Sequence, residues 1–321
     1  MLLDILFITL GFAGLIWGAD KFVAGASAIA LNFGVAPLMI GLTIVAFGTS
    51  APEFFSSAVA AIEGQPELAI GNAVGSNIFN IGVALGITTI IRPLTPPSSL
   101  LRQELPAMML VTVVTGLLFA DLYLGFVDSL ALIALLLFLA YRLFRKKTTS
   151  PNPQCIEEDL EELDIPSIDT WRAAAYLFFG LVLLIAGAEA LVSGASSVAV
   201  RMGVSSGIIG LTIVAMGTSL PELASTVAAV LRGHHDLAIG NIVGSNILNL
   251  LVVLPFPGLL SAGFIDPTML TRDYATMLLM SCVMYGVCFW TVKSGKSIGR
   301  FCGIGFLTMY GGWFFTMYQQ L

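Results

Sequence analysis

The residues best suited to chemistry are two glutamates that occupy equivalent positions in a repeated polar segment. Glu53 lies within residues 41–80 and Glu222 within residues 210–249, and the two segments align without a gap at an offset of 169 residues (222 − 53). Roughly three in five aligned positions are identical, and the identities fall mostly on polar and small residues. An internal repeat of this kind must be recognised before the fold is assigned. Two copies of a polar segment inside apolar sequence indicate a transport path.

Hydroxyl groups and a proline accompany each glutamate. Thr49 and Ser50 precede Glu53 by four and three residues, which places the three side chains on one face of a helix. Pro52 removes a helix hydrogen bond and displaces the carbonyl group one turn earlier, so a main-chain oxygen becomes available as a ligand. The second copy repeats this arrangement with Thr218, Ser219, Pro221 and Glu222.

A stripe of amides and hydroxyls follows in the next apolar segment of each copy. Its members lie at i, i+4 and i+8: Asn72, Ser76 and Asn80 in the first copy, and Asn241, Ser245 and Asn249 in the second. Hydrogen bonding between helices is the common role of such a stripe in a membrane. Here each stripe is tied to a carboxylate and a helix-breaking proline, which favours an ion site.

The chemistry of the oxygens indicates which ion the site would bind. Carboxylates, hydroxyls, amides and loosened carbonyls form an all-oxygen set, with no Cys or His at ligand distance in the sequence. Ca²⁺ takes about six to eight oxygen ligands, whereas Zn²⁺ and Cu⁺ prefer nitrogen or sulfur. Two carboxylates balance one Ca²⁺ or two Na⁺, and a site that holds either ion in turn is the physical basis of exchange. We therefore expect Ca²⁺ and Na⁺ as transported ions, and no cofactor.

Composition places most of the chain in lipid. Of 321 residues, 57% are hydrophobic and only 11% are charged, and the mean hydropathy is +0.94. With about 20 apolar residues to a span, we predict an all-α membrane protein with ten transmembrane helices. The lipid bilayer is then the main surrounding, and nothing indicates a nucleic acid or an obligate protein partner. The predicted spans are 3–30, 36–62, 68–91, 104–121, 124–144, 171–199, 205–231, 237–262, 274–292 and 299–318.

The distribution of Lys and Arg predicts the orientation in a plasma (inner) membrane. One set of connections holds eleven of these residues, and the opposite set holds only Arg201 and Arg272. Both termini are then outside, and the acidic, proline-flanked segment 146–169 is cytoplasmic. We interpret that segment as a solvated linker, not a cation sensor, because it lacks EF-hand spacing.

The repeat and the span count together predict two inverted halves. Residues 1–145 hold five spans, residues 146–169 form the linker, and residues 170–321 hold five more. Because five is odd, the second copy enters the membrane from the opposite side, as in transporters built from inverted repeats.

The paired motifs GTSxPE and GNxVGSN are similar to the alpha repeats of the calcium/cation antiporter superfamily, on its sodium/calcium exchanger branch. The similarity covers about 80 residues in each half and the ten-span plan. It implies antiport of Ca²⁺ against a monovalent cation by alternating access, with the first span of each half sliding past a fixed core. It also implies Glu53 and Glu222 as central ligands. Further oxygens would come from Thr49, Ser50, Ser76, Asn80, Thr218, Ser219 and Ser245.

One position departs from the pattern of that family. Several exchangers of the branch have an Asp in the second repeat where this chain has Asn249. An Asn249 ligand gives a symmetrical site with one potential negative charge fewer, which bears on the sodium stoichiometry and on the identity of the counter-ion.

Other functions remain open from the residues alone. Glu53 and Glu222 could carry protons in a proton/cation exchanger, or line a passive cation channel. An intramembrane protease with two acids sharing a proton is a third alternative, but it leaves the shell of Thr, Ser and Asn unexplained. Outside the motifs, we expect an internal ion pair of Asp20 and Lys21, or a Lys21 side chain that extends to the membrane surface, in preference to a transport role. We expect His234 and His235 to be solvated in a cytoplasmic turn, with pH sensing as the alternative.

Overall fold

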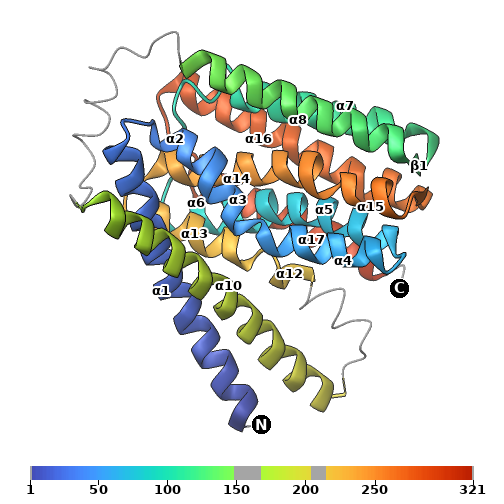
Figure 1. Cartoon of the computed structure of the whole chain (residues 1–321), viewed down its shortest axis with the longest axis horizontal. Helices are drawn as coiled ribbons and strands as arrows, with labels where there is room; N and C mark the ends of the chain where they lie inside the picture. The colour runs from blue at the N-terminus through green and yellow to red at the C-terminus, as the bar shows by residue number, and fades with distance from the viewer. Residues whose placement is uncertain (1, 148–167, 204–214, 320–321) are drawn as a thin grey trace.

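The structure of this chain, a computed structural model, describes residues 2–147, 168–203 and 215–319, which are almost entirely helical (Figure 1). Two short pairings of extended backbone are also present: an isolated antiparallel bridge between Leu94 and Ile298, and a two-residue ladder. Strand β1 (Tyr123–Leu124) pairs antiparallel with β2 (Gly263–Phe264), and the rings of Tyr123 and Phe264 meet edge to face. This ladder is absent from the all-α prediction, because it joins two connections that are distant in sequence.

The first half consists of α1 (Leu2–Asn32); α2 (Pro37–Ile40), the π-helix η1 (Gly41–Val45), α3 (Ala46–Thr49) and α4 (Ala51–Ile62); α5 (Pro66–Phe79), the π-helix η2 (Asn80–Leu85) and α6 (Gly86–Ile91); α7 (Glu104–Leu118) and the 3₁₀ turn η3 (Phe119–Asp121); and α8 (Phe126–Lys147). The second half consists of α10 (Thr170–Arg201); α12 (Ala215–Gly217) and α13 (Leu220–Leu231); α14 (His235–Leu248), the π-helix η5 (Asn249–Val253) and α15 (Pro255–Leu260); the π-helix η6 (Met269–Tyr274) and α16 (Ala275–Ser294); and α17 (Arg300–Tyr318).

Six helical segments of the described residues are long and apolar enough to cross a membrane, and the bent pair of residues 37–62 makes a seventh. These seven correspond to seven of the predicted spans. Helices α8, α13 and α17 coincide with the other three but do not meet the same criterion, so the ten-span count stays a prediction. Residues 204–214 of the seventh predicted span and residues 148–167 of the predicted linker lie outside the described part of the chain.

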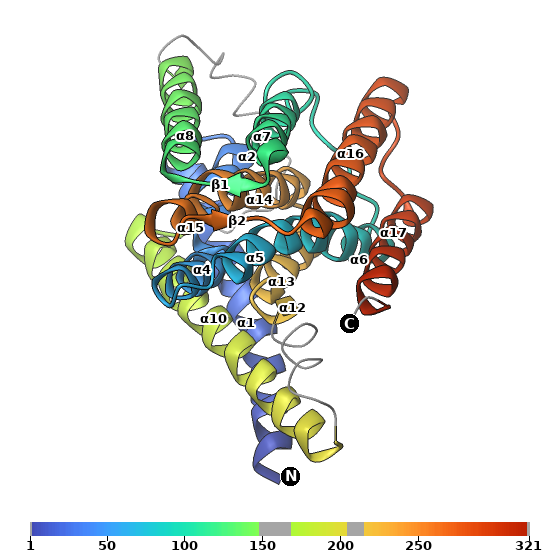
Figure 2. The same cartoon turned by 90° about the vertical axis from the view of Figure 1, so that its right-hand side faces the viewer.

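The two longest helices, α1 and α10, pack against each other with their backbones in contact. A Cβ atom at Gly18 would lie 2.6 Å from the Leu184 nitrogen, and one at Gly180 would lie 2.4 Å from the Phe22 nitrogen. The two helices run antiparallel, since Asp4 near the start of α1 pairs with Arg201 at the end of α10. Figures 1 and 2 show the pair projecting beyond the other helices at the N-terminal end of α1.

The helices that carry the amide stripes, α5 and α14, lie at the centre of the bundle. Most residues of both helices are buried. The backbone of α14 also touches the segment α2–η1, because a Cβ atom at Gly240 would lie 2.6 Å from the Leu38 carbonyl oxygen. Glycines therefore bring the first motif of one half against the second motif of the other.

The structure confirms one expectation about charged residues in part and contradicts another. Asp20 is 3.8 Å from Lys21, but it also accepts a hydrogen bond from Arg232 Nε at 2.9 Å, so its main partner comes from the other half. His234 is only 3% exposed and not solvated. The turn that contains it is held inward, since Arg92 Nη1 donates to the carbonyl oxygens of Val230 and Leu231 at 3.1 Å.

Candidate ion-binding site

A helix break positions each glutamate at the start of a helix. Ser50 interrupts the segment between α3 and α4, which bends by 46°, and Glu53 lies in the first turn of α4. Ser219 precedes α13, with Glu222 in its first turn. A proline is tolerated at this position because the first N–H groups of a helix have no partner within it. The positive end of the helix dipole also favours a carboxylate there.

Each glutamate is bound by serine hydroxyls, one of which belongs to the other half of the chain. Ser219 Oγ donates to Glu53 Oε1 at 2.7 Å, and Ser76 Oγ lies 3.3 Å from the same oxygen. In the other copy, Ser50 Oγ donates to Glu222 Oε1 at 2.8 Å, and Ser245 Oγ lies at 3.5 Å. The structure thus brings six of the predicted site residues together in two crossed triads: Glu53, Ser76 and Ser219, and Glu222, Ser50 and Ser245.

A layer of amides crosses between the halves in the same way. Asn80 Nδ2 donates to Asn246 Oδ1 at 3.1 Å, and Asn249 Nδ2 donates to Asn77 Oδ1 at 3.1 Å. Asn77 Nδ2 in turn donates to the Asn246 carbonyl oxygen at 3.1 Å. Asn77 and Asn246 were not among the predicted site residues. Each is the last residue of a GNxVGSN motif, directly after Ser76 or Ser245 of the stripe, and the repetition of the motif was the available signal.

The remaining members of the motifs support the glutamate backbone. Asn72 Nδ2 donates to the Glu53 carbonyl oxygen at 3.1 Å, and Asn241 Nδ2 lies 3.4 Å from that of Glu222. The predicted ligand Thr49 donates its hydroxyl to Asn241 Oδ1 at 3.2 Å, and Thr218 does the same to Asn72 Oδ1 at 3.5 Å. The threonine hydroxyls are therefore engaged with the supporting amides.

Four oxygens remain without a donor. Among the described residues, these oxygens are buried and accept no hydrogen bond: Glu53 Oε2, Glu222 Oε2, Asn80 Oδ1 and Asn249 Oδ1. Glu53 is 0% exposed and Glu222 is 1% exposed. Burial of an unpartnered acceptor costs about 1–3 kcal/mol, and more when the group is charged. Such a set of oxygens is suited to a cation, which supplies the positive charge that hydrogen-bond donors do not.

The described residues also limit the kind of cation. They contain no group of three or more His, Cys, Asp or Glu side chains that could hold a metal ion. The two glutamates are thus the charged members of the site, and the other oxygens are neutral. Hard cations that prefer oxygen, such as Ca²⁺, suit this set better than Zn²⁺ or copper.

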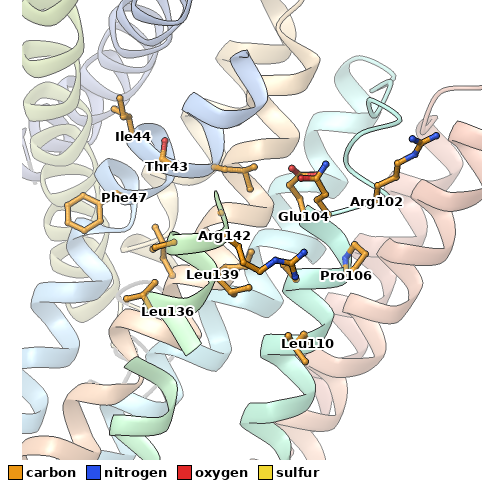
Figure 3. A pocket seen from close by; sticks show the side chains of 17 residues that line it. Thr43, Ile44, Phe47, Arg102, Glu104, Pro106, Leu110, Leu136, Leu139 and Arg142 are labelled. Atoms are coloured by element: carbon orange, nitrogen blue, oxygen red, sulfur yellow. The ribbon is translucent and has the colours of Figure 1, made fainter. Parts of the chain in front are cut away.

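A cavity with mainly apolar walls lies elsewhere. It has a volume of about 650 Å³ and is formed by η1 and α3, by α7 and the residues before it, and by α8 and α14 (Figure 3). Figure 3 shows Arg142 extending toward α7. None of the predicted site residues lines this cavity. The site is instead enclosed between the helices.

Comparisons with known proteins show the family of the chain and its fold. The sequence matches the family described as sodium/calcium exchanger protein over residues 3–145 and 172–319. It is 43% identical to the putative antiporter CaxA of Alkalimonas amylolytica over 279 residues, or 87% of each chain. It is 38% identical to the inner membrane protein YrbG of Escherichia coli (strain K12) over 314 residues, covering 96% of this chain and 95% of the relative. The fold is similar to that of the sodium-calcium exchanger NCX_Mj, with a TM-score of 0.82 and 32% identity over 97% of both chains.

Proposed function

Because this chain belongs to the sodium/calcium exchanger protein family, we propose that it exchanges Ca²⁺ against Na⁺ by alternating access at the site of Glu53 and Glu222. Its relatives and its fold are those of a cation antiporter and not of an enzyme. The family membership confirms the resemblance found in the two motifs. The coupling to Na⁺ and the assignment of the site to the bilayer midplane are our proposals.

The main support for this proposal is that Glu53 and Glu222 are both buried and that each has one carboxylate oxygen without a hydrogen-bond partner. Together they supply a charge of −2, which one Ca²⁺ or two Na⁺ would neutralise. Glu53 Oε2, Glu222 Oε2, Asn80 Oδ1 and Asn249 Oδ1 would be ligands. Main-chain carbonyls near the breaks at Ser50 and Ser219 would complete the number of oxygens that Ca²⁺ prefers.

We further propose ten spans in two inverted halves in an inner membrane, with both termini outside and the segment 146–169 in the cytoplasm. Two features support this. Adding the offset of 169 to the bounds of α1 gives 171–201, within one residue of the bounds of α10, and these equivalent helices run antiparallel. The Lys and Arg residues also gather on one set of connections.

The charge of the site sets an expectation for stoichiometry. Three Na⁺ at a site of charge −2 would leave one charge uncompensated. With an effective dielectric constant of about 20, that charge costs on the order of 4 kcal/mol at about 4 Å from another. We therefore propose that the chain moves fewer Na⁺ per Ca²⁺ than relatives with an Asp at the position of Asn249, and that its cycle is closer to electroneutral.

The test of this function is uptake of ⁴⁵Ca²⁺ into liposomes that contain the purified protein, under imposed gradients. A gradient of Na⁺ should drive uptake, whereas gradients of K⁺ or protons alone should not. Uptake driven by protons in the absence of Na⁺ would favour the proton/cation exchanger. Flux of Ca²⁺ without any counter-flux would indicate a channel.

A further inference from the structure

Helices α1 and α10 form a unit that is joined to the other helices almost entirely by apolar contacts. Leu15 and Ala19 of α1 cluster with Leu184 and Ala188 of α10, and Leu220, Ala224 and Ala228 of α13 pack against this cluster. Small and apolar surfaces of this kind allow one helix to shift past another without loss of hydrogen bonds.

One polar contact crosses this apolar interface. Arg232, directly after α13, donates from Nε to Asp20 Oδ1 at 2.9 Å, and its Nη2 also contacts that oxygen. Within residues 2–147, 168–203 and 215–319, the other side-chain polar contacts of the unit stay inside it or beside its ends. Asp4 pairs with Arg201, and Asn32 donates to the Ile168 carbonyl oxygen.

The ion pair is mechanically connected to the candidate site. Arg232 follows the last residue of α13, whose first turn holds Glu222 ten residues earlier. Arg92, which ends α6, fixes the same end of α13 by donating to the carbonyls of Val230 and Leu231. Helix α13 is therefore anchored to α6, while Asp20 connects it to the unit of α1 and α10.

The residues that the repeat makes equivalent to this ion pair do not carry opposite charges. Subtracting or adding the offset of 169 relates Asp20 to Glu189 on α10 and Arg232 to Glu63 at the end of α4. Under the proposed inversion, the conformation open to the opposite side would bring Glu63 and Glu189 together, as Asp20 and Arg232 are together in the conformation described here. The first pair attracts, whereas two glutamates repel.

We propose that the ion pair of Asp20 and Arg232 is a latch that favours the conformation described here over the opposite one. The proposal rests on alternating access by the unit of α1 and α10. The ion pair is present in one conformation and broken in the other, and the repulsion of Glu63 and Glu189 adds to the same bias. Lys21, 3.8 Å from Asp20, stays within the unit and does not replace Arg232 across the interface.

The test measures the populations of the two conformations directly. Spin labels are placed at Ile62→Cys and Val200→Cys, both on exposed side chains at ends of α4 and α10, in a protein without its native cysteines. Distance distributions by electron paramagnetic resonance then report the fraction in each conformation. Asp20→Asn and Arg232→Gln should each increase the ratio of minor to major conformation by about two- to fivefold, as expected for a partly exposed ion pair. The double variant should show no further increase.

Two more variants make the result decisive. Arg201→Gln breaks an ion pair inside the unit and should leave the ratio unchanged. Glu63→Arg offers Glu189 an opposite charge and should shift the ratio in the same direction as Asp20→Asn. The latch is wrong if Arg201→Gln acts like Arg232→Gln, if the two latch substitutions add, or if none of them changes the distribution. This measurement needs no ion flux, so exchange of Ca²⁺ against Na⁺ can succeed or fail independently of it.

Discussion

At the scale of single residues, each site glutamate depends on the other half of the chain. Glu53 is bound by Ser219, and Glu222 is bound by Ser50. One oxygen of each carboxylate is used in these bonds, which leaves Oε2 buried without a donor. The same division holds for the amides of Asn80 and Asn249, whose nitrogens are engaged while their oxygens are free of donors. These hydrogen bonds fix the orientation of the carboxylates and of the amides.

We predict that Asn249→Asp raises the number of Na⁺ coupled to each Ca²⁺, because an ionised Asp takes the site from −2 to −3. The Asn77 amide, which accepts from Asn249 in the present structure, would then turn to donate to the new carboxylate. The measurement is the reversal potential of Ca²⁺ flux in liposomes of known Na⁺ ratio. Equal reversal potentials for the two forms, or three Na⁺ already moved by the unsubstituted protein, would contradict this account.

Much of the candidate site could be predicted from sequence, because the repeat marks its residues twice. Glu53, Ser50 and Ser76 follow from helical spacing within one copy. The crossed pairing could not be predicted, since it depends on how two segments 169 residues apart meet. The roles of Asn77 and Asn246 were missed for the same reason: their partners lie on the opposite copy.

Among the helices, close approach of the backbones determines two contacts: that of α14 with α2 at the centre of the bundle, and that of α1 with α10. Glycines of α1 and α10 let these helices touch along their length, and Gly240 does the same for α14 against α2. The broken helices at Ser50 and Ser219 expose helix ends at the site. The sequence signals these breaks through proline, but it gives no signal for the π-helices η1, η2 and η5, which depend on packing.

The glycine contact of α1 and α10 is testable by adding one methyl group. Gly180→Ala places a Cβ atom 2.4 Å from the Phe22 nitrogen, so the helices must separate. We expect a lower thermal unfolding midpoint and slower exchange of Ca²⁺. Gly286→Ala on α16 is the matched control, because a Cβ there has no neighbour within 4 Å. In a helix this control should be neutral or stabilising by up to about 1 kcal/mol. Equal effects of both substitutions would refute the contact.

The turn between α13 and α14 provides a pH-dependent test. Burial, followed by the positive charges of Arg232 and His235, lowers the pKa of His234 to about 4. The unfolded chain, with a pKa near 6.5, binds more protons between these values, so stability falls as pH falls from 7 toward 4. At pH 5 the loss is about 2 kcal/mol.

His234→Gln should remove this dependence. The measurement is thermal unfolding in detergent at pH 7 and pH 5. The midpoint of the unsubstituted protein should fall more between these values than that of the variant. Parallel pH dependences would show that His234 is not buried in its neutral form.

At the scale of the whole molecule, two similar halves meet at one site. The equivalent helices α1 and α10 run antiparallel (Figures 1 and 2). Of the equivalent serines, Ser50 donates to Glu222 and Ser219 donates to Glu53, so each serine binds the glutamate of the other half. The helical class and the ends of several spans could be predicted from hydropathy; segment 104–121 is one example. The ladder of β1 and β2 could not, because its two strands have two residues each and no pattern of their own.

The predicted orientation is tested by labelling from one side. In a protein without its native cysteines, Gln65→Cys at the start of α5 should react with an impermeant maleimide added to intact cells. Ser150→Cys in the predicted linker should react only after permeabilisation. Reaction of both positions from the same side would contradict the inverted arrangement of five and five spans.

The central claim is that Glu53 and Glu222 form one site that holds Ca²⁺ or Na⁺, but not both. Its most direct test is equilibrium binding of ⁴⁵Ca²⁺ to the purified protein in increasing concentrations of Na⁺. We expect one Ca²⁺ per chain, displaced completely by Na⁺. Glu53→Gln and Glu222→Gln, which keep the volume and remove the charge, should each abolish binding, whereas Glu67→Gln on the exposed start of α5 should not. Simultaneous binding of both ions, or unchanged Ca²⁺ affinity in either site variant, would contradict the account.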